Sequence, residues 1–157
     1  MQQTDSYYLL GIIVRFLQRS PDTGGAYSLV EATCAPGAGA PPNRHPDDDE
    51  AFYVVEGEFE FHVAGEDIRA TAGSFIRVPN GAIHAFRNAG SAPGRLLVMN
   101  TPGVVHDGFF SQVGEPMPPG TRELPDRAPE RPDIPQLIEI ARRNGMEIIL
   151  PPGPHHV

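Results

Sequence analysis

Residues 37–57, GAGAPPNRHPDDDEAFYVVEG, and residues 73–88, GSFIRVPNGAIHAFRN, are the stretches that decide the fold. In both, turn-forming glycine, proline and asparagine residues separate short segments rich in aromatic and β-branched side chains. Such segments are typical of β-strands, and the residues between them are typical of tight turns. The two stretches therefore predict strands joined by short turns.

Strand patterns extend outward from this region, from residue 7 to about residue 101. Apolar residues recur at every second position from Tyr8 to Phe16, and Phe59, Phe61 and Val63 alternate with polar residues. This period of two indicates strands with one buried face. Turn signals recur about every eight to twelve residues, and the chain contains 17 glycines and 18 prolines. We therefore predict an all-β sandwich or barrel.

The C-terminal part has a different composition. A short helix is expected over residues 106–113, and seven of the twenty residues from Pro116 to Pro135 are proline, which predicts an extended surface linker. Apolar residues at helical spacing predict a second helix over residues 134–144, and residues 146–150 fit a last strand. We predict a single domain, in which residues 1–115 form the β-structure and residues 116–157 a Pro-rich linker and helix packed on it.

Composition and targeting signals narrow the function classes. The chain has 157 residues and a formal net charge of −8, which argues against a nucleic-acid partner. Its one cysteine, Cys34, excludes an intramolecular disulfide and a multi-cysteine zinc site, and is expected to be a small buried side chain. The N-terminal segment lacks the order of a secretory signal, and its apolar stretch is shorter than the ~20 residues of a membrane span. We expect a soluble, cytoplasmic protein with no membrane partner.

Residues of metal-binding type lie at the turns of the predicted strands. His45 and Glu50 lie where a loop enters a strand, and His84 follows a second turn. Two imidazoles and a carboxylate are the ligands of a facial triad, which leaves positions on a divalent metal open. Spacing alone leaves two interpretations open: a metal site, or ordinary surface and core histidines.

The spacing of these residues resembles the cupin family. Its two motifs are G-x5-H-x-H-x4-E-x6-G and G-x5-P-x-G-x2-H-x3-N. The first reads here Gly37, Asn43, His45, Glu50 and Gly57, and the second Gly73, Pro79, Gly81, His84 and Asn88. Every spacing is intact, and one residue departs, because Asn43 stands where the family has its first histidine. The surrounding sequence resembles single-domain, quercetinase-like cupins. The resemblance implies a jelly-roll β-barrel of two antiparallel sheets.

The resemblance also implies the site. His45, Glu50 and His84 would be catalytic residues and ligands of one divalent transition metal: iron, manganese, nickel, cobalt or zinc. Asn43 would be a weak ligand through its amide oxygen, or would orient a bound water. In the alternative, the site binds no metal and the three residues perform acid–base chemistry. Glu50 either accepts a proton from an enol or phenol of the substrate or acts as a ligand only.

Alternation along the strands predicts which side chains point inward with Glu50. The predicted pocket lining is Phe52, Val54, Phe59, Phe61, Phe75, Phe86 and Met99. Such a lining suits a flat aromatic or polyketide ligand, and equally an ordinary core. Tyr53 is expected on the opposite face, at packing or interface positions, and His62 on a solvent-exposed face. His106, His155 and His156 lie outside the motifs and receive no role, and residues 47–49 are expected to form a solvated loop.

Three function classes fit these observations. The favoured class is a quercetinase-like dioxygenase acting on a flavonol, polyphenol or aromatic polyketide. The second is a non-oxidative polyketide cyclase or isomerase that uses the same pocket, and the third is a non-catalytic module that binds a small molecule. We expect a homodimer, because the apolar N-terminal strand would leave a sheet edge free to pair and because the resemblance implies a dimer. Whether the C-terminal segment covers the pocket is left open.

Overall fold

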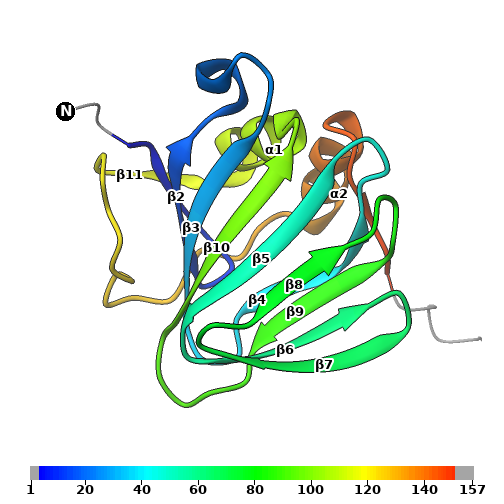
Figure 1. The fold of residues 1–157 in the computed structure, drawn as a ribbon. Helices are drawn as coiled ribbons and strands as arrows, with labels where there is room; N and C mark the ends of the chain where they lie inside the picture. Colours follow the sequence, from blue (N-terminus) through cyan, green and yellow to red (C-terminus); the bar gives the residue numbers. More distant parts are fainter. Residues whose placement is uncertain (1–3, 151–157) are drawn as a thin grey trace, which may run out of the picture.

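A computed structural model describes residues 4–150 and shows two antiparallel β-sheets with helices gathered at one end (Figure 1). The strands are β1 (Ser6–Leu9), β2 (Ile12–Gln18), β3 (Ser28–Cys34), β4 (Gly39–Arg44), β5 (Asp49–Glu56), β6 (Glu58–Val63), β7 (Glu66–Thr71), β8 (Phe75–Val78), β9 (His84–Asn88), β10 (Gly94–Thr101), β11 (Glu115–Met117) and β12 (Glu147–Ile148). The helices are α1 (Val104–Val113), α2 (Ile134–Arg143) and a 3-10 turn over Ser20–Thr23. The predicted all-β fold of two antiparallel sheets with a short helical appendage is confirmed.

The two sheets face each other across one apolar core. The first sheet has the order β11-β1-β2-β3-β10-β5-β8 and the second β12-β4-β9-β6-β7. Phe52 and Val54 from the first sheet pack with Phe59 and Phe61 from the second, and all four are buried. Burial of such side chains stabilises the fold by roughly 1.5–3 kcal/mol each. The core thereby holds the inward faces of β5 and β9, which carry Glu50 and His84, at fixed positions.

Strands β4 and β9 approach each other closely next to the site. At Gly39 in β4, a Cβ atom would lie 1.9 Å from the carbonyl oxygen of Phe86 in β9. Only glycine permits this approach. Further along the same strand pair, Asn43 lies directly opposite His84. The neighbouring strand β5 lies in the other sheet and brings Glu50 to the same end of the core.

The N-terminal apolar stretch is two strands and not the single strand expected from Tyr8 to Phe16. Leu10 and Gly11 adopt φ values of 54° and 81° and turn the chain between β1 and β2. Nor is β1 the edge of its sheet, because β11 pairs with it. The linker predicted from Pro116 therefore begins with a strand, and the edge argument for a homodimer is wrong.

A second apolar cluster lies under the helices. Val105 and Phe109 from α1 pack with Leu137 and Ile140 from α2 and with Met146. The Asp133 side chain accepts a hydrogen bond from the Gln136 amide and caps α2. After α2, strand β12 pairs with β4 of the second sheet. The C-terminal segment is thus joined to the sheet strand that carries Asn43.

Several further expectations concern single side chains. Cys34 is fully buried, and this burial raises the pKa of its thiol to about 12. His62 lies on an exposed face, where its Nδ1 is 2.7 Å from Asp67. His155 and His156 lie outside the described residues. Among residues 4–150, no helix has the length and apolar character needed to span a membrane.

Candidate metal centre

Three residues of the two motifs meet around one carboxylate. The Oε2 atom of Glu50 lies 2.8 Å from Nε2 of His45 and 2.7 Å from Nε2 of His84. His45 follows β4, Glu50 lies in β5 and His84 begins β9, and at most 5% of each residue is exposed. The structure therefore brings together the three residues that the sequence identified as candidate ligands.

Backbone carbonyls orient both rings. Nδ1 of His45 lies 2.9 Å from the carbonyl oxygen of Asp48, and Nδ1 of His84 lies 2.9 Å from that of Ala82. Because a carbonyl only accepts, each Nδ1 carries a proton, and a neutral ring then presents the lone pair of Nε2 to Glu50. Two lone pairs and a carboxylate oxygen at these distances require a cation between them, either protons on the rings or a metal ion. In metal-binding histidines one ring nitrogen typically donates to a backbone carbonyl and the other binds the metal ion. His45 and His84 have this arrangement, with Nδ1 on a carbonyl and Nε2 directed at Glu50, so the donor set fits a divalent metal.

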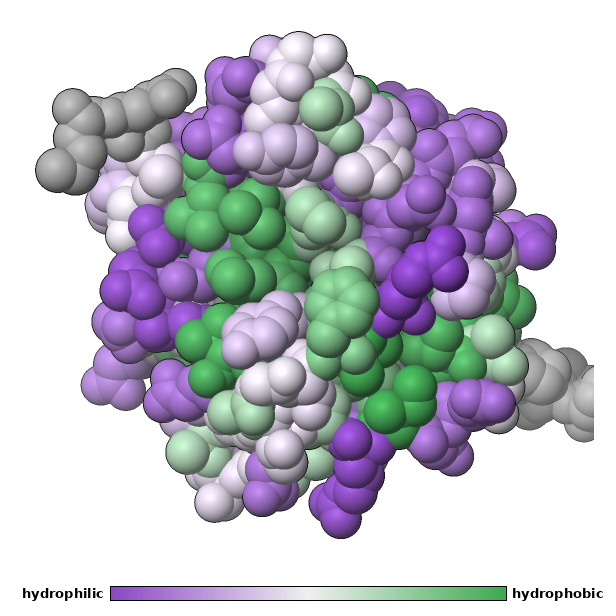
Figure 2. All heavy atoms as spheres, viewed as in Figure 1, coloured by the Kyte–Doolittle hydropathy of each residue, from purple (hydrophilic) through white to green (hydrophobic). Residues whose placement is uncertain are grey.

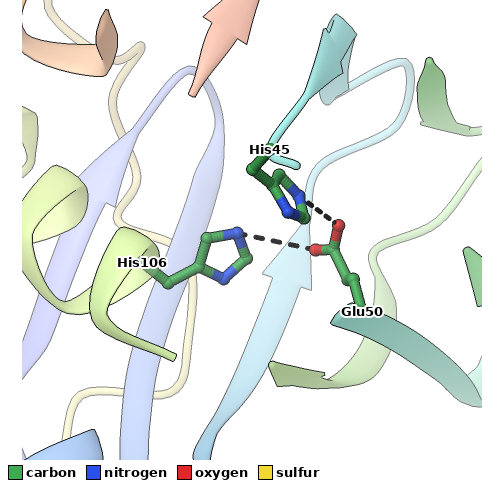
Figure 3. A group of neighbouring side chains, drawn as sticks. All are labelled: His45, Glu50 and His106. Carbon is green, nitrogen blue, oxygen red and sulfur yellow. Dashed lines mark hydrogen bonds and ion pairs between the residues drawn. The ribbon is translucent and has the colours of Figure 1, made fainter. Parts of the chain in front are cut away.

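A further histidine, His106 in α1, joins this group. Its Nε2 lies 3.5 Å from Oε1 of Glu50, and its ring centre is 5.8 Å from that of His45. Donor atoms of His45, Glu50 and His106 all lie within 4.8 Å of one another (Figure 3). The sequence analysis gave His106 no role because it lies outside both motifs. Its position one turn before Phe109 and Phe110, on the apolar side of the predicted helix, was the signal that pointed inward.

The side chain of Asn43 donates hydrogen bonds to the backbone at this site. The side chain is buried, and its Nδ2 donates to the carbonyl oxygens of Pro41, at 2.9 Å, and His84, at 3.3 Å. The bond to His84 joins β4 to β9, whereas Pro41 lies in β4 itself. Asn43 therefore occupies the motif position of the missing histidine while its amide nitrogen is used to hold two strands together.

Burial and pairing set the charges of the group. Burial would raise the pKa of Glu50, but the contacts with His45 and His84 outweigh it and hold this pKa well below its usual range. Burial lowers the pKa of His106 to about 4. For His45, burial would lower the pKa, and the partner Glu50 raises it overall. At neutral pH the carboxylate is ionised and His106 is neutral, which are the forms that bind metal ions.

An apolar cavity of about 100 Å³ opens next to Glu50, His84 and His106. Of the predicted lining residues, Phe52 and Phe86 border it, whereas Val54, Phe59 and Phe61 are buried in the core and do not. The prediction is wrong for Phe75 and Met99, which are 64% and 42% exposed. Their strands present them to the outer face, where Phe75 lies opposite Tyr53.

The C-terminal segment covers this cavity. Leu137 from α2, Met146 before β12 and Ile148 in β12 border it, together with Phe109 and Phe110 of α1. The sequence left open whether the C-terminal segment covers the pocket, and the packing of the second apolar cluster shows that it does. Access to the histidines and Glu50 is bounded by two helices.

Comparison with known proteins agrees with the fold and the motifs. A family model for the cupin domain matches residues 30–100. The matched segment carries Asn43, His45, Glu50 and His84. The RmlC-like cupin from Shewanella frigidimarina has a similar fold, with a TM-score of 0.56 and 24% identity over 65% of this chain and 86% of that one.

Two curated relatives have different names. The tetracenomycin polyketide synthase protein TcmJ of Streptomyces glaucescens is 31% identical over 85 residues, which are 53% of this chain and 57% of that protein. Quercetin 2,3-dioxygenase of Bacillus subtilis is 26% identical over 102 residues, 65% of this chain and 30% of that protein. The similarity thus spans little more than half of one relative and less than a third of the other.

Proposed function

We propose that this protein is a metal-dependent enzyme that acts on a small phenolic or enolic substrate, of the flavonol, polyphenol or aromatic polyketide class. The observation that carries the proposal is the convergence of His45, His84 and Glu50 beside an apolar cavity. A buried group of this kind with few polar atoms in an apolar wall is typical of a small-molecule site. His45, Glu50 and His84 would hold the metal ion.

The residues around the ion have separate tasks. When bound, the metal ion supplies Lewis-acid and redox chemistry for a substrate oxygen and for dioxygen. Glu50 lines the cavity and would accept the proton of the substrate hydroxyl, so that the substrate becomes an electron-rich anion. Phe52 and Phe86 border the cavity and pack against a flat ring, and the apolar wall excludes water.

Our first candidate for the reaction is a dioxygenase. The relative named quercetin 2,3-dioxygenase and the position of Glu50 at the apolar cavity support it. The test is dioxygen uptake by protein loaded in turn with Fe²⁺, Mn²⁺, Co²⁺ or Ni²⁺, with a panel of flavonols and polyphenols. We expect uptake that is lost in Glu50→Gln and kept in His62→Ala, whose side chain lies on the exposed face. No uptake with any metal and substrate would contradict this candidate.

The relative named as a polyketide synthase protein favours a second candidate, a cyclase or isomerase. It is the more similar of the two, and the match covers the larger share of its length. In this reaction Glu50 would take a proton from a carbon or hydroxyl next to a carbonyl, and the product would have the mass of the substrate or that mass less water. Anaerobic turnover of an aromatic polyketide precursor supports it. Binding of such compounds without any conversion would instead indicate a non-catalytic module.

A further inference from the structure

We infer that His106 is a metal ligand and takes the coordination role that Asn43 has given up, so that helix α1 completes a site begun by the two motifs. The inference rests on the proposed metal function. It adds a fourth protein ligand, from a segment that lies outside the match to the cupin family model. Three observations support it: the engagement of Asn43, the placement of the His106 ring, and the way α1 is held.

The amide nitrogen of Asn43 is committed to the backbone. This nitrogen donates to the carbonyl oxygens of Pro41 and His84, so the orientation of the side chain is fixed by the pairing of β4 with β9. An amide oxygen is also a poorer ligand for transition metals than an imidazole. The motif position therefore offers a weak amide ligand in place of an imidazole, and a further imidazole would bind the metal ion more strongly.

The His106 ring lies on the side of Glu50 that the motif histidines leave free. His45 and His84 both approach Oε2, whereas Nε2 of His106 faces Oε1 at 3.5 Å. The ring is buried, and its Nδ1 has no hydrogen-bond partner among the described residues. Buried polar groups are nearly always hydrogen-bonded. A hydrogen bond of Nδ1 therefore does not explain why a histidine is buried at this position. The contact with Glu50 through Nε2 is what the position provides.

Hydrogen bonds of residues on both sides of His106 in the sequence hold the first turn of α1 in place. The Gly103 amide, just before α1, donates to Asp48, which lies in the loop between His45 and Glu50. Asp107, next to His106, accepts a hydrogen bond from the amide of Ser20 at 2.8 Å. The loop that supplies two ligands thus also holds the start of the helix that supplies the third histidine. A helix turn anchored at two points holds the His106 side chain in place for binding a metal ion.

The test measures Co²⁺ binding by calorimetry and by the visible absorption spectrum of the bound ion, without any substrate. We expect His106→Ala to weaken Co²⁺ binding at least about tenfold and to change the spectrum, since a ligand nitrogen is lost. His106→Phe keeps a ring in the packed position and should show the same loss with an unchanged thermal unfolding temperature of the metal-free protein. His62→Ala, an exposed histidine, should match the parent.

The variant Asn43→Ala tests whether Asn43 or His106 is the fourth metal ligand. We expect it to keep the Co²⁺ spectrum of the parent, since no coordinating atom is removed. A changed spectrum in Asn43→Ala with a parental spectrum in His106→Phe would overturn the inference and make Asn43 the ligand. Parental affinity and spectrum in both His106 variants would overturn it while leaving the metal function in place. A parent that binds no Co²⁺, Fe²⁺, Mn²⁺, Ni²⁺ or Zn²⁺ would overturn both proposals.

Discussion

The carboxylate of Asp48 accepts a hydrogen bond from the amide of Gly103 at 2.9 Å, and only 1% of Asp48 is exposed. This bond joins the loop between His45 and Glu50 to the start of α1. The sequence predicted a solvated loop over residues 47–49, and for Asp48 that prediction is wrong. A carboxylate near a helix N-terminus satisfies an amide that has no partner within the helix, and this accounts for its burial.

Removing this bond should loosen α1. We expect Asp48→Ala to lower the free energy of unfolding by about 1–2 kcal/mol, as for the loss of a helix cap. Asp48→Asn keeps an acceptor oxygen and should lose less. Urea unfolding followed by circular dichroism measures both, with the exposed Asp47→Ala as the matched control. Equal stabilities of Asp48→Ala and Asp47→Ala would show that the bond does not hold the helix.

The cover formed by α2 should control both stability and access. Leu137 borders the cavity and is 7% exposed, whereas Ile134 on the same helix is 48% exposed. We expect Leu137→Ala to cost about 2–5 kcal/mol in the free energy of unfolding, and Ile134→Ala much less.

The same substitution tests substrate entry. The cavity volume of about 100 Å³ is below the ~300–1,000 Å³ of typical ligand sites, so a flavonol-sized molecule needs the cover to move. Leu137→Ala should therefore bind large polyphenols more tightly than the parent in a fluorescence titration. Weaker binding by Leu137→Ala, with Ile134→Ala unchanged, would indicate that Leu137 contacts the ligand directly.

Glu31, a buried carboxylate outside the candidate metal centre, should make the stability of the fold depend on pH. Glu31 in β3 accepts hydrogen bonds from Arg15 and, through both oxygens, from Arg122. Burial alone would raise the pKa of Glu31, but bonding to Arg122 and the charges of the nearby arginines lower it below its usual value of 4.5. A carboxylate whose pKa is lower in the folded state stabilises that state above the unfolded pKa, and the stabilisation is lost as the pH falls.

Glu31→Gln removes this contribution. We expect the variant to be less stable than the parent at pH 7, and the difference to shrink as the pH falls below about 5. Thermal unfolding of both proteins between pH 7 and pH 3 measures it, with the exposed Glu66→Gln as control. A difference that stays constant over this range would mean that Glu31 contributes through packing alone.

The outer face of the first sheet is the surface on which we expect a second copy to dock. Tyr53, Val55, Phe75 and Met99 are each more than 40% exposed on neighbouring strands β5, β8 and β10. Hydrophobic side chains gather over the face of the molecule turned toward the viewer in Figure 2. Exposed aromatic and methionine side chains of this kind are enriched at protein–protein interfaces.

A single charge should abolish the homodimer if it forms there. We propose that Phe75→Glu shifts the mass measured by light scattering from that of a dimer to that of a monomer, without loss of thermal stability. Arg69→Glu, on the exposed side of β7, should keep the dimer. A parent protein that is monomeric at all concentrations would contradict the homodimer, and a dimer that survives Phe75→Glu would place the interface elsewhere.

The sequence predicted the fold and the motif residues because both depend on local spacing. Turn residues and period-two strands fix the sheets, and the register that follows sets Asn43 opposite His84. The prediction failed where the alternation of residues along a strand does not show which of its two faces is buried. In β8, Phe75 and Ile76 are both apolar, and only the pairing of Phe75 with Tyr53 and of Ile76 with Phe52 determines which one is buried.

His106 could not be placed from spacing. Its approach to Glu50 depends on how α1 docks, through the bond between Asp48 and Gly103, which are 55 residues apart in sequence. No motif describes such a contact. The apolar side chains of Phe109 and Phe110, one turn after His106, indicate an inward-facing side of this helix, but not which atom of the site the ring meets.

The burial of Cys34 has a practical consequence. It is the one cysteine of the chain, it is fully buried, and its thiol stays protonated at neutral pH. Since an exposed thiolate is the nucleophile that reacts with a maleimide, the buried, protonated Cys34 does not react with such reagents. A cysteine introduced at Ile134 would therefore take a fluorophore or spin label as the single modified position. The distance from that label to a paramagnetic ion at the histidines would then report, in the otherwise unaltered sequence, how far α2 lifts when a substrate enters.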